Sequence, residues 1–412
     1  MSAVLSDPAA RSDFRTIIVV GASHGTSHFF HLMLPPLFPW LMADFSLNYT
    51  QAGALMTVFF VVSGIGQALA GFVVDRFGAR RVLFSGIALL AASGIVLAVA
   101  HEYATLAVAA AVAGLGNSVF HPADYTVLNR RVSPARLGHA FSVHGLSGNL
   151  GWAIAPVFMA GVAGMAGWRS AAIAAAAVGL VMLALLLSQR DAMAVPAHAD
   201  PHPGSRSVPG SNSTLTFLGV PAVWMCFAYF VVGTMAFGVL QNFSPGALGG
   251  LYGLSLVVAT SALSAYLLGG AAGIAAGGFL AGRARGHERI ITLALGTAAA
   301  VALILAGGAA PGWAVIPLMV AMGFGSGVAG PSRDMLVRHA ATGTLGPRAY
   351  GRVYGFVYSG LDVGLALAPL AFGPLMDQGR FGSVLAGVAL LQVLAIGAAL
   401  GVASQAHPAR RA

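Results

Sequence analysis

The chain has 412 residues, of which 58% are hydrophobic and only 8% are charged, and its mean hydropathy is +0.83. Soluble domains carry about 45–50% apolar and about 25% charged residues, so this composition excludes a soluble globular protein. The formal net charge of +9 does not indicate a nucleic-acid partner, because the arginines that carry it stand in short segments between long apolar runs.

Apolar runs long enough to cross a bilayer follow one another along the whole chain. A helix of about 20 apolar residues spans the hydrocarbon core and satisfies its own backbone hydrogen bonds there. Six such helices are predicted near residues 16–41, 50–74, 82–100, 104–128, 138–164 and 168–188. Six more are predicted near residues 217–243, 251–281, 290–309, 313–338, 350–375 and 381–404. We therefore predict an all-α integral membrane protein with twelve transmembrane helices.

The two sets of six helices share a sequence pattern. Gly114, Gly116, Val119 and Pro122 of the fourth predicted helix recur at constant spacing as Gly323, Gly325, Val328 and Pro331 of the tenth. Gly138, Asn149, Gly151, Ala155 and Pro156 of the fifth recur as Gly351, Asp362, Gly364, Ala368 and Pro369 of the eleventh. The repeat predicts two pseudo-symmetric six-helix bundles with a solute site between them.

A segment rich in Pro, Ser, His and Ala separates the two halves. Because such a composition cannot bury a core, residues 189–214 are predicted to form a cytoplasmic linker. The predicted domains are then an N-terminal bundle over residues 1–188 and a C-terminal bundle over residues 215–412.

Arginine placement predicts the orientation in the membrane, since cytoplasmic loops carry an excess of basic residues. The arginines gather in alternate loops: Arg76, Arg80, Arg81, Arg130, Arg131, Arg136, Arg190, Arg206, Arg283, Arg285, Arg289, Arg348 and Arg352. Those loops are expected to be cytoplasmic. With an even number of helices both termini are then cytoplasmic, and the expected location is a bacterial inner (plasma) membrane.

The loop after the second predicted helix carries the most specific motif in the chain. It reads Gly71-Phe-Val-Val-Asp75-Arg76-Phe77-Gly78-Ala79-Arg80-Arg81 and resembles the signature of the major facilitator superfamily. Gly78 permits a tight turn, and Asp75 can bind the positive N-terminal end of a helix. The resemblance implies the major facilitator fold, with Asp75, Arg76, Arg80 and Arg81 in a cytoplasmic gate. The equivalent loop of the second half has Gly282 in place of the acid, so only Asp75 is expected to act as the gate acid.

Within that superfamily, three further segments resemble the fosmidomycin-resistance group of exporters. They are the run from Ser27 to Pro39, Gln51-Ala-Gly53, and Phe120-His121-Pro122-Ala123. The fifth predicted helix contains Gly148-Asn-Leu-Gly151-Trp-Ala-Ile-Ala155-Pro156, a partial match to a pattern found in many proton-coupled exporters. That resemblance favours export, although small residues at this spacing also serve plain helix packing.

Ionisable residues inside predicted membrane helices are functional candidates, because a charge at the bilayer centre costs at least about 2.5–3.5 kcal/mol. His24, His28 and His31 are spaced i, i+4 and i+7, which places three imidazoles on one helix face. Proton or solute contact, hydrogen bonding between helices, and metal binding are all compatible with this stripe. The sequence shows no acidic residue in the stripe, so no metal site is predicted.

The fourth and tenth predicted helices carry opposite charges at equivalent positions of the repeat. Asp124 and Arg333 each stand two residues after the repeated proline, and Asn117 and His121 share the face of Asp124. One hypothesis is an ion pair between the bundles that closes the cytoplasmic side. The alternative is separate local pairing, for example of Arg333 with Asp334.

The eleventh predicted helix presents Tyr354, Tyr358 and Asp362 on one face. A lone carboxylate in a low-dielectric cavity suits reversible protonation, so Asp362 is predicted to couple protons to transport, against the alternative of a hydrogen-bonded structural acid. His144 and Asn149 complete the predicted proton and solute pathway. The weaker cavity candidates are Gln67, Tyr229, Gln241 and Asn242.

The function predicted from these features is a secondary active transporter that works by alternating access, most simply as a proton-coupled exporter of a small organic solute. A proton symporter importing an organic anion and a non-transporting membrane receptor are the alternatives. No nucleophile elbow or P-loop occurs in the sequence, so neither an enzyme nor a cofactor is expected. The expected partners are a small-molecule substrate, protons and the lipid bilayer, and the chain is expected to be a monomer.

Overall fold

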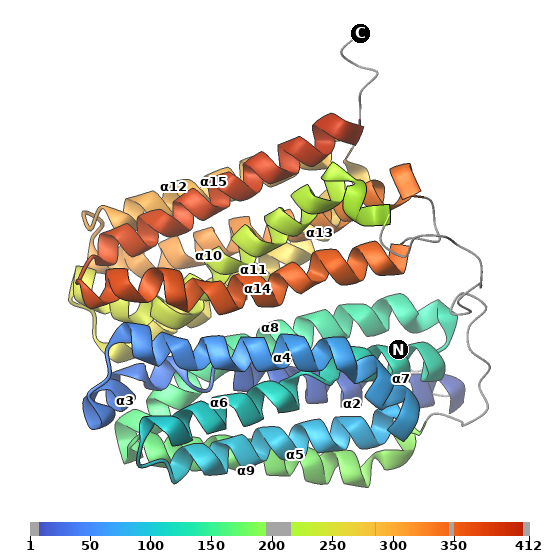
Figure 1. Ribbon diagram of the computed structural model, residues 1–412, viewed down its shortest axis with the longest axis horizontal. Helices are drawn as coiled ribbons and strands as arrows, with labels where there is room; N and C mark the ends of the chain where they lie inside the picture. The colour runs from blue at the N-terminus through green and yellow to red at the C-terminus, as the bar shows by residue number, and fades with distance from the viewer. Residues whose placement is uncertain (1–7, 195–215, 285, 346–349, 407–412) are drawn as a thin grey trace. The chain divides into compact units, whose positions relative to one another are not determined.

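The computed structural model describes residues 8–194, 216–284, 286–345 and 350–406, and every regular element in these ranges is a helix (Figure 1). The α-helices of the first half are α2 (Pro8–His31), α3 (Phe38–Phe45), α4 (Tyr49–Phe77), α5 (Ala79–Ala98), α6 (Tyr103–Asn117), α7 (Phe120–Arg131), α8 (Leu137–Ala166) and α9 (Trp168–Ser188). Those of the second half are α10 (Pro221–Tyr252), α11 (Leu256–Arg283), α12 (His287–Ala306), α13 (Val315–Leu345), α14 (Tyr350–Asp377) and α15 (Phe381–Ala406).

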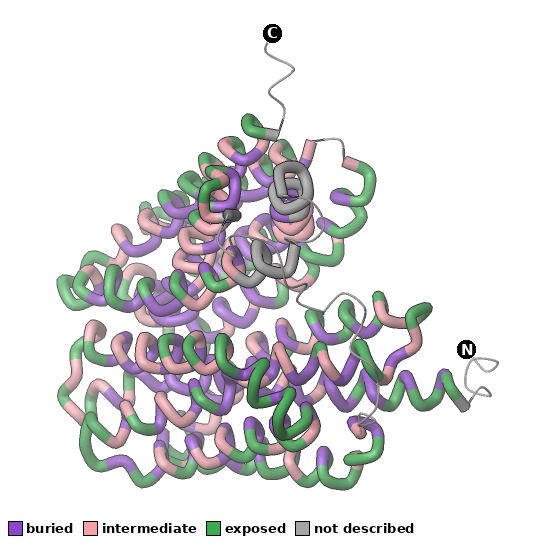
Figure 2. The backbone as a smooth tube through the Cα atoms, turned by 45° about the vertical axis from the view of Figure 1, so that its right-hand side comes forward, coloured by how far each residue is buried: buried purple, intermediate pink, exposed green. Residues whose placement is uncertain are grey.

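Twelve helical segments of the described residues are long and apolar enough to cross a membrane, which confirms the predicted number. In the first, α2 and α3 are joined by a short 3₁₀ helix, Pro35–Leu37, and in the fourth, α6 is followed by α7. Each helix has exposed positions along its length (Figure 2). Many large apolar side chains are among the exposed ones, for example Met165, Phe72 and Leu293, which are 83%, 76% and 74% exposed. Exposed apolar surface on this scale requires lipid as its solvent.

Prolines lie at the breaks of the first and fourth spans. Proline removes a backbone donor and clashes with the carbonyl four residues earlier. Pro35 and Pro36 follow the end of α2, and Pro122 interrupts the fourth span at residues 118–119, between α6 and α7. Its repeat partner, Pro331, lies inside the continuous helix α13 instead.

The chain divides into two compact units, one formed by residues 1–46 and 58–209 and the other by residues 47–57 and 210–412. In the first unit, α2 packs against α8, and α5 packs against α6 and α9. In the second unit, α10 packs against α14, and α12 packs against α13 and α15. These are corresponding pairs of the sequence repeat, so these helix contacts are common to the two units.

The repeated glycines lie where helices approach most closely. A β-carbon on Gly114 or on its repeat partner Gly323 would clash with a backbone carbonyl of the neighbouring helix, at Phe59 of α4 and Tyr266 of α11 respectively. A β-carbon on Gly116 or Gly325 would likewise clash with a backbone carbonyl, of α5 and α12 respectively. Close packing of backbones is how helices associate in lipid, and it accounts for the glycine part of the repeat.

Several predicted features fall outside the described residues. They include residues 195–215, which make up most of the predicted linker and contain Arg206. Arg285 and Arg348 also lie outside the described residues. The start of the predicted linker is described, and it forms a 3₁₀ helix, Arg190–Met193, after α9.

Candidate functional site

The first spanning helix buries three imidazoles inside the first unit. His24, His28 and His31 of α2 are 2%, 8% and 7% exposed. Their spacing places them on one helix face, and this face is turned into the unit.

Two other helices bring further titratable side chains to the same place. α7 carries His121 and Asp124, one turn apart, and α8 carries His144. Asp124 is fully buried and His144 is 4% exposed. We refer to His24, His28, His31, His121 and His144 as the histidine cluster. Asp124 is the acidic residue that contacts it.

Glycines of α8 make room for the imidazoles. A β-carbon on Gly148 would lie 2.7 Å from Nδ1 of His28 and 3.0 Å from Nε2 of His24. A β-carbon on Gly151, one turn further, would clash with the carbonyl of Gly25 in α2. The glycines at these two positions therefore allow α2 and α8 to hold bulky rings between closely spaced backbones.

Two imidazole nitrogens lie close to the same carboxylate oxygen of Asp124. Its Oδ2 lies 3.0 Å from Nε2 of His144 and 3.3 Å from Nδ1 of His24. The rings of His24 and His144 stack with their centroids 3.5 Å apart. The other oxygen, Oδ1, makes no hydrogen bond with any described residue, and neither does Nδ1 of His24, whose 3.3 Å contact is not aligned for one. The Oδ1 atom of this buried carboxylate is therefore available to accept a hydrogen bond or to bind a cation.

His31 is held in a chain of hydrogen bonds that joins four spanning segments. The indole N–H of Trp152 in α8 donates to Nδ1 of His31 over 3.2 Å. Because Nδ1 accepts, Nε2 carries the proton of the neutral ring and donates to Oδ1 of Asn117 over 2.7 Å. The Asn117 amide in turn donates to the hydroxyl of Ser63 in α4 over 2.8 Å. For His31 this geometry favours hydrogen bonding between helices over proton or solute contact.

The remaining imidazoles lie in contact with one another. The ring centroid of His28 is 4.3 Å from that of His24 and 4.1 Å from the indole of Trp152. His121 lies 5.3 Å from His24 by the same measure, and its Nδ1 is 3.1 Å from the amide oxygen of Gln67. Neighbouring imidazoles beside a carboxylate can exchange protons or hold a cation.

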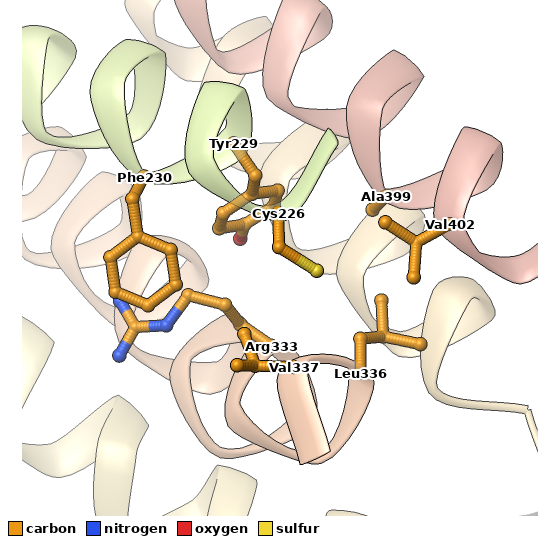
Figure 3. Close-up of a pocket in the computed structure, with 8 residues that line it drawn as sticks. All are labelled: Cys226, Tyr229, Phe230, Arg333, Leu336, Val337, Ala399 and Val402. Atoms are coloured by element: carbon orange, nitrogen blue, oxygen red, sulfur yellow. The ribbon is translucent and has the colours of Figure 1, made fainter. Parts of the chain in front are cut away.

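In the second unit, Arg333 of α13 is paired locally. Its Nε donates to Oδ1 of Asp334 over 2.9 Å, and the hydroxyl of Tyr358 donates to the same oxygen over 3.0 Å. The guanidinium stands over the ring of Phe230, 4.5 Å from its centroid (Figure 3). The charge of Arg333 is therefore balanced by a carboxylate and an aromatic face.

A small cavity beside Arg333 does not have the size of a solute site. Its lining comes from α10, α13 and α15 (Figure 3): Cys226, Tyr229, Phe230, Arg333, Leu336, Val337, Ala399 and Val402. The cavity holds about 10 Å³, which is close to the minimum for a single water molecule. Its wall is continuous with the buried core of the unit, and this favours a packing role for Tyr229 and Cys226.

Asp362 lies half-buried in α14, and its carboxylate makes no hydrogen bond or ion pair with another described residue. Its repeat partner, Asn149, donates from its amide to the carbonyl of Gly145 in its own helix over 2.9 Å. Tyr358, one turn before Asp362, is engaged with Asp334 as described above. The side chain of Tyr354 lies outside the described residues.

The motif after the second spanning helix forms a tight turn with an adjoining hollow. Gly78 has a φ of +84° and separates α4 from α5, as its predicted role requires. Asp75 and Arg76 are exposed. A hollow of about 450 Å³ opens here, lined by Val74, Asp75, Arg76, Phe77, Gly78, Ala79, Arg80, Arg81, Thr126, Arg130 and Ala194. Asp75, Arg76, Arg80 and Arg81, the gate residues that the family resemblance implies, thus line one basic hollow, whereas Asp124 lies apart from it, beside the histidine cluster.

The structure describes a local partner for each member of the predicted ion pair between the bundles. Asp124 contacts His144 and His24, and Arg333 contacts Asp334. The two residues belong to different units, so the pair between them stays a prediction.

Sequence reasoning missed two parts of the cluster. It placed no acidic residue with the α2 histidines, whereas α7 brings Asp124 to within 3.3 Å of His24. It also passed over Trp152, although His144, Gly148 and Trp152 at i, i+4 and i+8 form one face of α8. That periodic face was visible in the sequence; the meeting of α7 with α2 was not.

Comparison with known proteins gives consistent results over most of the chain. The model of the family described as Major Facilitator Superfamily matches residues 20–369. Over 282 residues the chain is 26% identical to the fosmidomycin resistance protein of Escherichia coli (strain K12), covering 67% of each chain. Over 393 residues it is 26% identical to YfnC of Bacillus subtilis (strain 168), an uncharacterised MFS-type transporter, covering 92% of this chain and 91% of that one.

A solved structure supports the fold independently of sequence. The crystal structure of a bacterial homolog of the human lysosomal transporter Spinster, in an inward-facing and occupied conformation, superposes with a TM-score of 0.74. The match covers 94% of this chain and 96% of that chain at 13% identity, so it is a likeness of fold alone.

Proposed function

Since the chain belongs to the major facilitator superfamily, a family of transporters rather than enzymes, we propose that it is a proton-coupled exporter of a small organic solute. The similarity to the fosmidomycin resistance protein supports export. The proposed setting is a bacterial inner membrane, with the chain acting as a monomer and both termini cytoplasmic. The basic hollow around Asp75 is the proposed cytoplasmic gate.

Proton coupling is proposed from the surroundings of Asp362. A carboxylate in a spanning helix is expensive to keep charged without a partner, and Asp362 has no hydrogen bond or ion pair with another described residue. It can therefore take up and release a proton without breaking a structural contact. Protonation would change the charge of the spanning region and so bias the equilibrium between two conformations.

The alternative of organic-anion import depends on Arg333 as a free cation. In the second unit this guanidinium is already paired with Asp334 and placed over Phe230. Recruiting it to a solute would break a charged hydrogen bond, worth about 1.5–3 kcal/mol. These contacts favour export over anion symport.

The test needs a solute, which a growth screen supplies. Strains with and without the protein are compared on a panel of antibiotics that includes fosmidomycin, and on carbon sources. Purified protein is then placed in liposomes with the radiolabelled solute outside. If it is an antiporter, an inside-acid gradient drives accumulation whichever way the protein inserts, because outward proton flow is exchanged for inward solute flow.

Each outcome of this experiment has one interpretation. Accumulation with the inside acid, abolished by a protonophore, is the expected result. Accumulation only with the outside acid would replace export by symport. In a parallel assay, liposomes are loaded with unlabelled solute and uptake of labelled solute by exchange (counterflow) is measured. Absence of counterflow for every solute selected by the screen would support the receptor alternative.

A further inference from the structure

We propose that His24, Asp124 and His144 form a binding site for one divalent transition-metal ion of the borderline class represented by Zn²⁺. The site lies inside the first unit, on three helices that the chain brings together from separate parts of the sequence. It goes beyond the proposed function and does not depend on the direction or coupling of transport.

The distances between the donor atoms suit a small tetrahedral ion. With bonds of about 2.0–2.2 Å, the ligand atoms of a tetrahedral zinc site lie about 3.3–3.6 Å apart. Oδ2 of Asp124 is 3.3 Å from Nδ1 of His24 and 3.0 Å from Nε2 of His144. All three ligand atoms lie within 4.8 Å of one another. Small side-chain adjustments therefore suffice to bring them around one ion.

Unpartnered buried atoms point independently to a ligand at this place. His24 is 2% exposed and Asp124 is fully buried. Nδ1 of His24 and Oδ1 of Asp124 nevertheless make no hydrogen bond with any described residue. Burying polar atoms in this state costs free energy that a bound cation would recover.

The donor set selects the class of metal. Two imidazole nitrogens with one carboxylate oxygen suit Zn²⁺ and its neighbours such as Co²⁺, whereas Mg²⁺ and Ca²⁺ require six or more oxygen ligands. Three protein ligands leave the fourth tetrahedral position open, as in zinc sites that exchange a ligand rather than in closed structural sites. The ion would connect α2, α7 and α8.

A second group of candidate ligands shares His24 with the first, and this limits the number of ions that can bind. His24, His28 and His121 also have donor atoms within 4.8 Å of one another. A neutral imidazole has only one nitrogen with a free lone pair, so His24 can serve one group or the other but not both. The cluster therefore binds a single ion.

The direct test is a titration of purified, tag-free, metal-stripped protein in detergent with Co²⁺, whose absorption reports tetrahedral coordination. One equivalent of Co²⁺ is expected to bind with a tetrahedral spectrum and to be displaced by Zn²⁺ but not by Mg²⁺. His144→Ala and Asp124→Asn should each lose more than the roughly 10–100-fold in affinity that removing an outer-shell partner costs. His101→Ala and His139→Ala are the matched controls, because both histidines are exposed, and they should bind as the wild type does.

A second measurement protects the test against variants that fail to fold. Zn²⁺ should raise the thermal unfolding midpoint of the wild-type protein in a concentration-dependent way, and should leave that of folded His144→Ala unchanged. The proposal is overturned if the wild type shows no saturable Co²⁺ binding. It is equally overturned if binding survives in both cluster variants, or is lost in the two exposed-histidine controls.

Discussion

Replacing Gly151 with alanine should destabilise the first unit, although the same change normally stabilises a helix. Gly151 lies in α8 where a β-carbon would clash with the carbonyl of Gly25 in α2. A β-carbon is fixed by the backbone of its own residue and the atoms that it would meet are backbone atoms of α2, so no side-chain rotation can relieve the clash. Helices α2 and α8 would have to separate at the level of the histidine cluster.

The magnitude follows from a comparison within the same helix. A change from glycine to alanine in a helix interior gains about 0.5–1 kcal/mol of stability when nothing is in the way. Gly161, also in α8, has no described atom within 4 Å of its would-be β-carbon, so Gly161→Ala should show this gain. Forcing an extra carbon into a packed contact costs about 1–3 kcal/mol. Since the propensity gain is common to both variants, they should differ by about 1–3 kcal/mol.

The assay is thermal unfolding of the two variants in the same detergent. At about 2–4 °C per kcal/mol, Gly151→Ala should melt several degrees below Gly161→Ala. The repeat offers a related experiment, because a β-carbon on Gly364 of α14 would clash with the Thr234 hydroxyl and the Val231 carbonyl of α10, while Gly397 of the neighbouring helix α15 is unobstructed. Equal midpoints for Gly151→Ala and Gly161→Ala would refute the close approach of α2 and α8.

Two further predictions concern other buried groups of the spanning helices. His31→Ala removes the hydrogen-bond partner of the Asn117 amide oxygen and should cost about 1–3 kcal/mol for this buried acceptor; thermal unfolding should show no comparable loss for the exposed His139→Ala. Cys226, the one cysteine of the chain, is 2% exposed, so a maleimide should label the native protein slowly and label it fully once SDS unfolds it. Rapid labelling of the native protein would show that α10 is not packed as described.

The twelve spans could be predicted because the bilayer imposes a length and a composition on each helix. The breaks were harder to predict. Pro122 and Pro331 hold the same position in the repeat, yet only Pro122 coincides with an interruption, between α6 and α7. The same residue at the same position of the repeat therefore gives different local structures, so a proline alone does not determine where a spanning helix breaks.

The candidate site was predictable only in part. The imidazole face of α2 follows from a spacing of i, i+4 and i+7 within one helix. The approach of Asp124 and His144 to His24 depends on contacts between residues 100 and 120 positions apart in the chain, for which a single sequence carries no periodic signal. The glycines at 148 and 151 marked the place of close packing, but they did not say which side chains would fill it.

Asp362 gives the most direct test of proton-coupled transport. In proteoliposomes, Asp362→Asn should lose solute accumulation driven by an inside-acid gradient, while Asp362→Glu should retain it. Counterflow of the same solute should persist in both variants, because exchange of solute for solute moves no net proton. Undiminished gradient-driven accumulation by Asp362→Asn would contradict the assignment of Asp362 as the coupling acid.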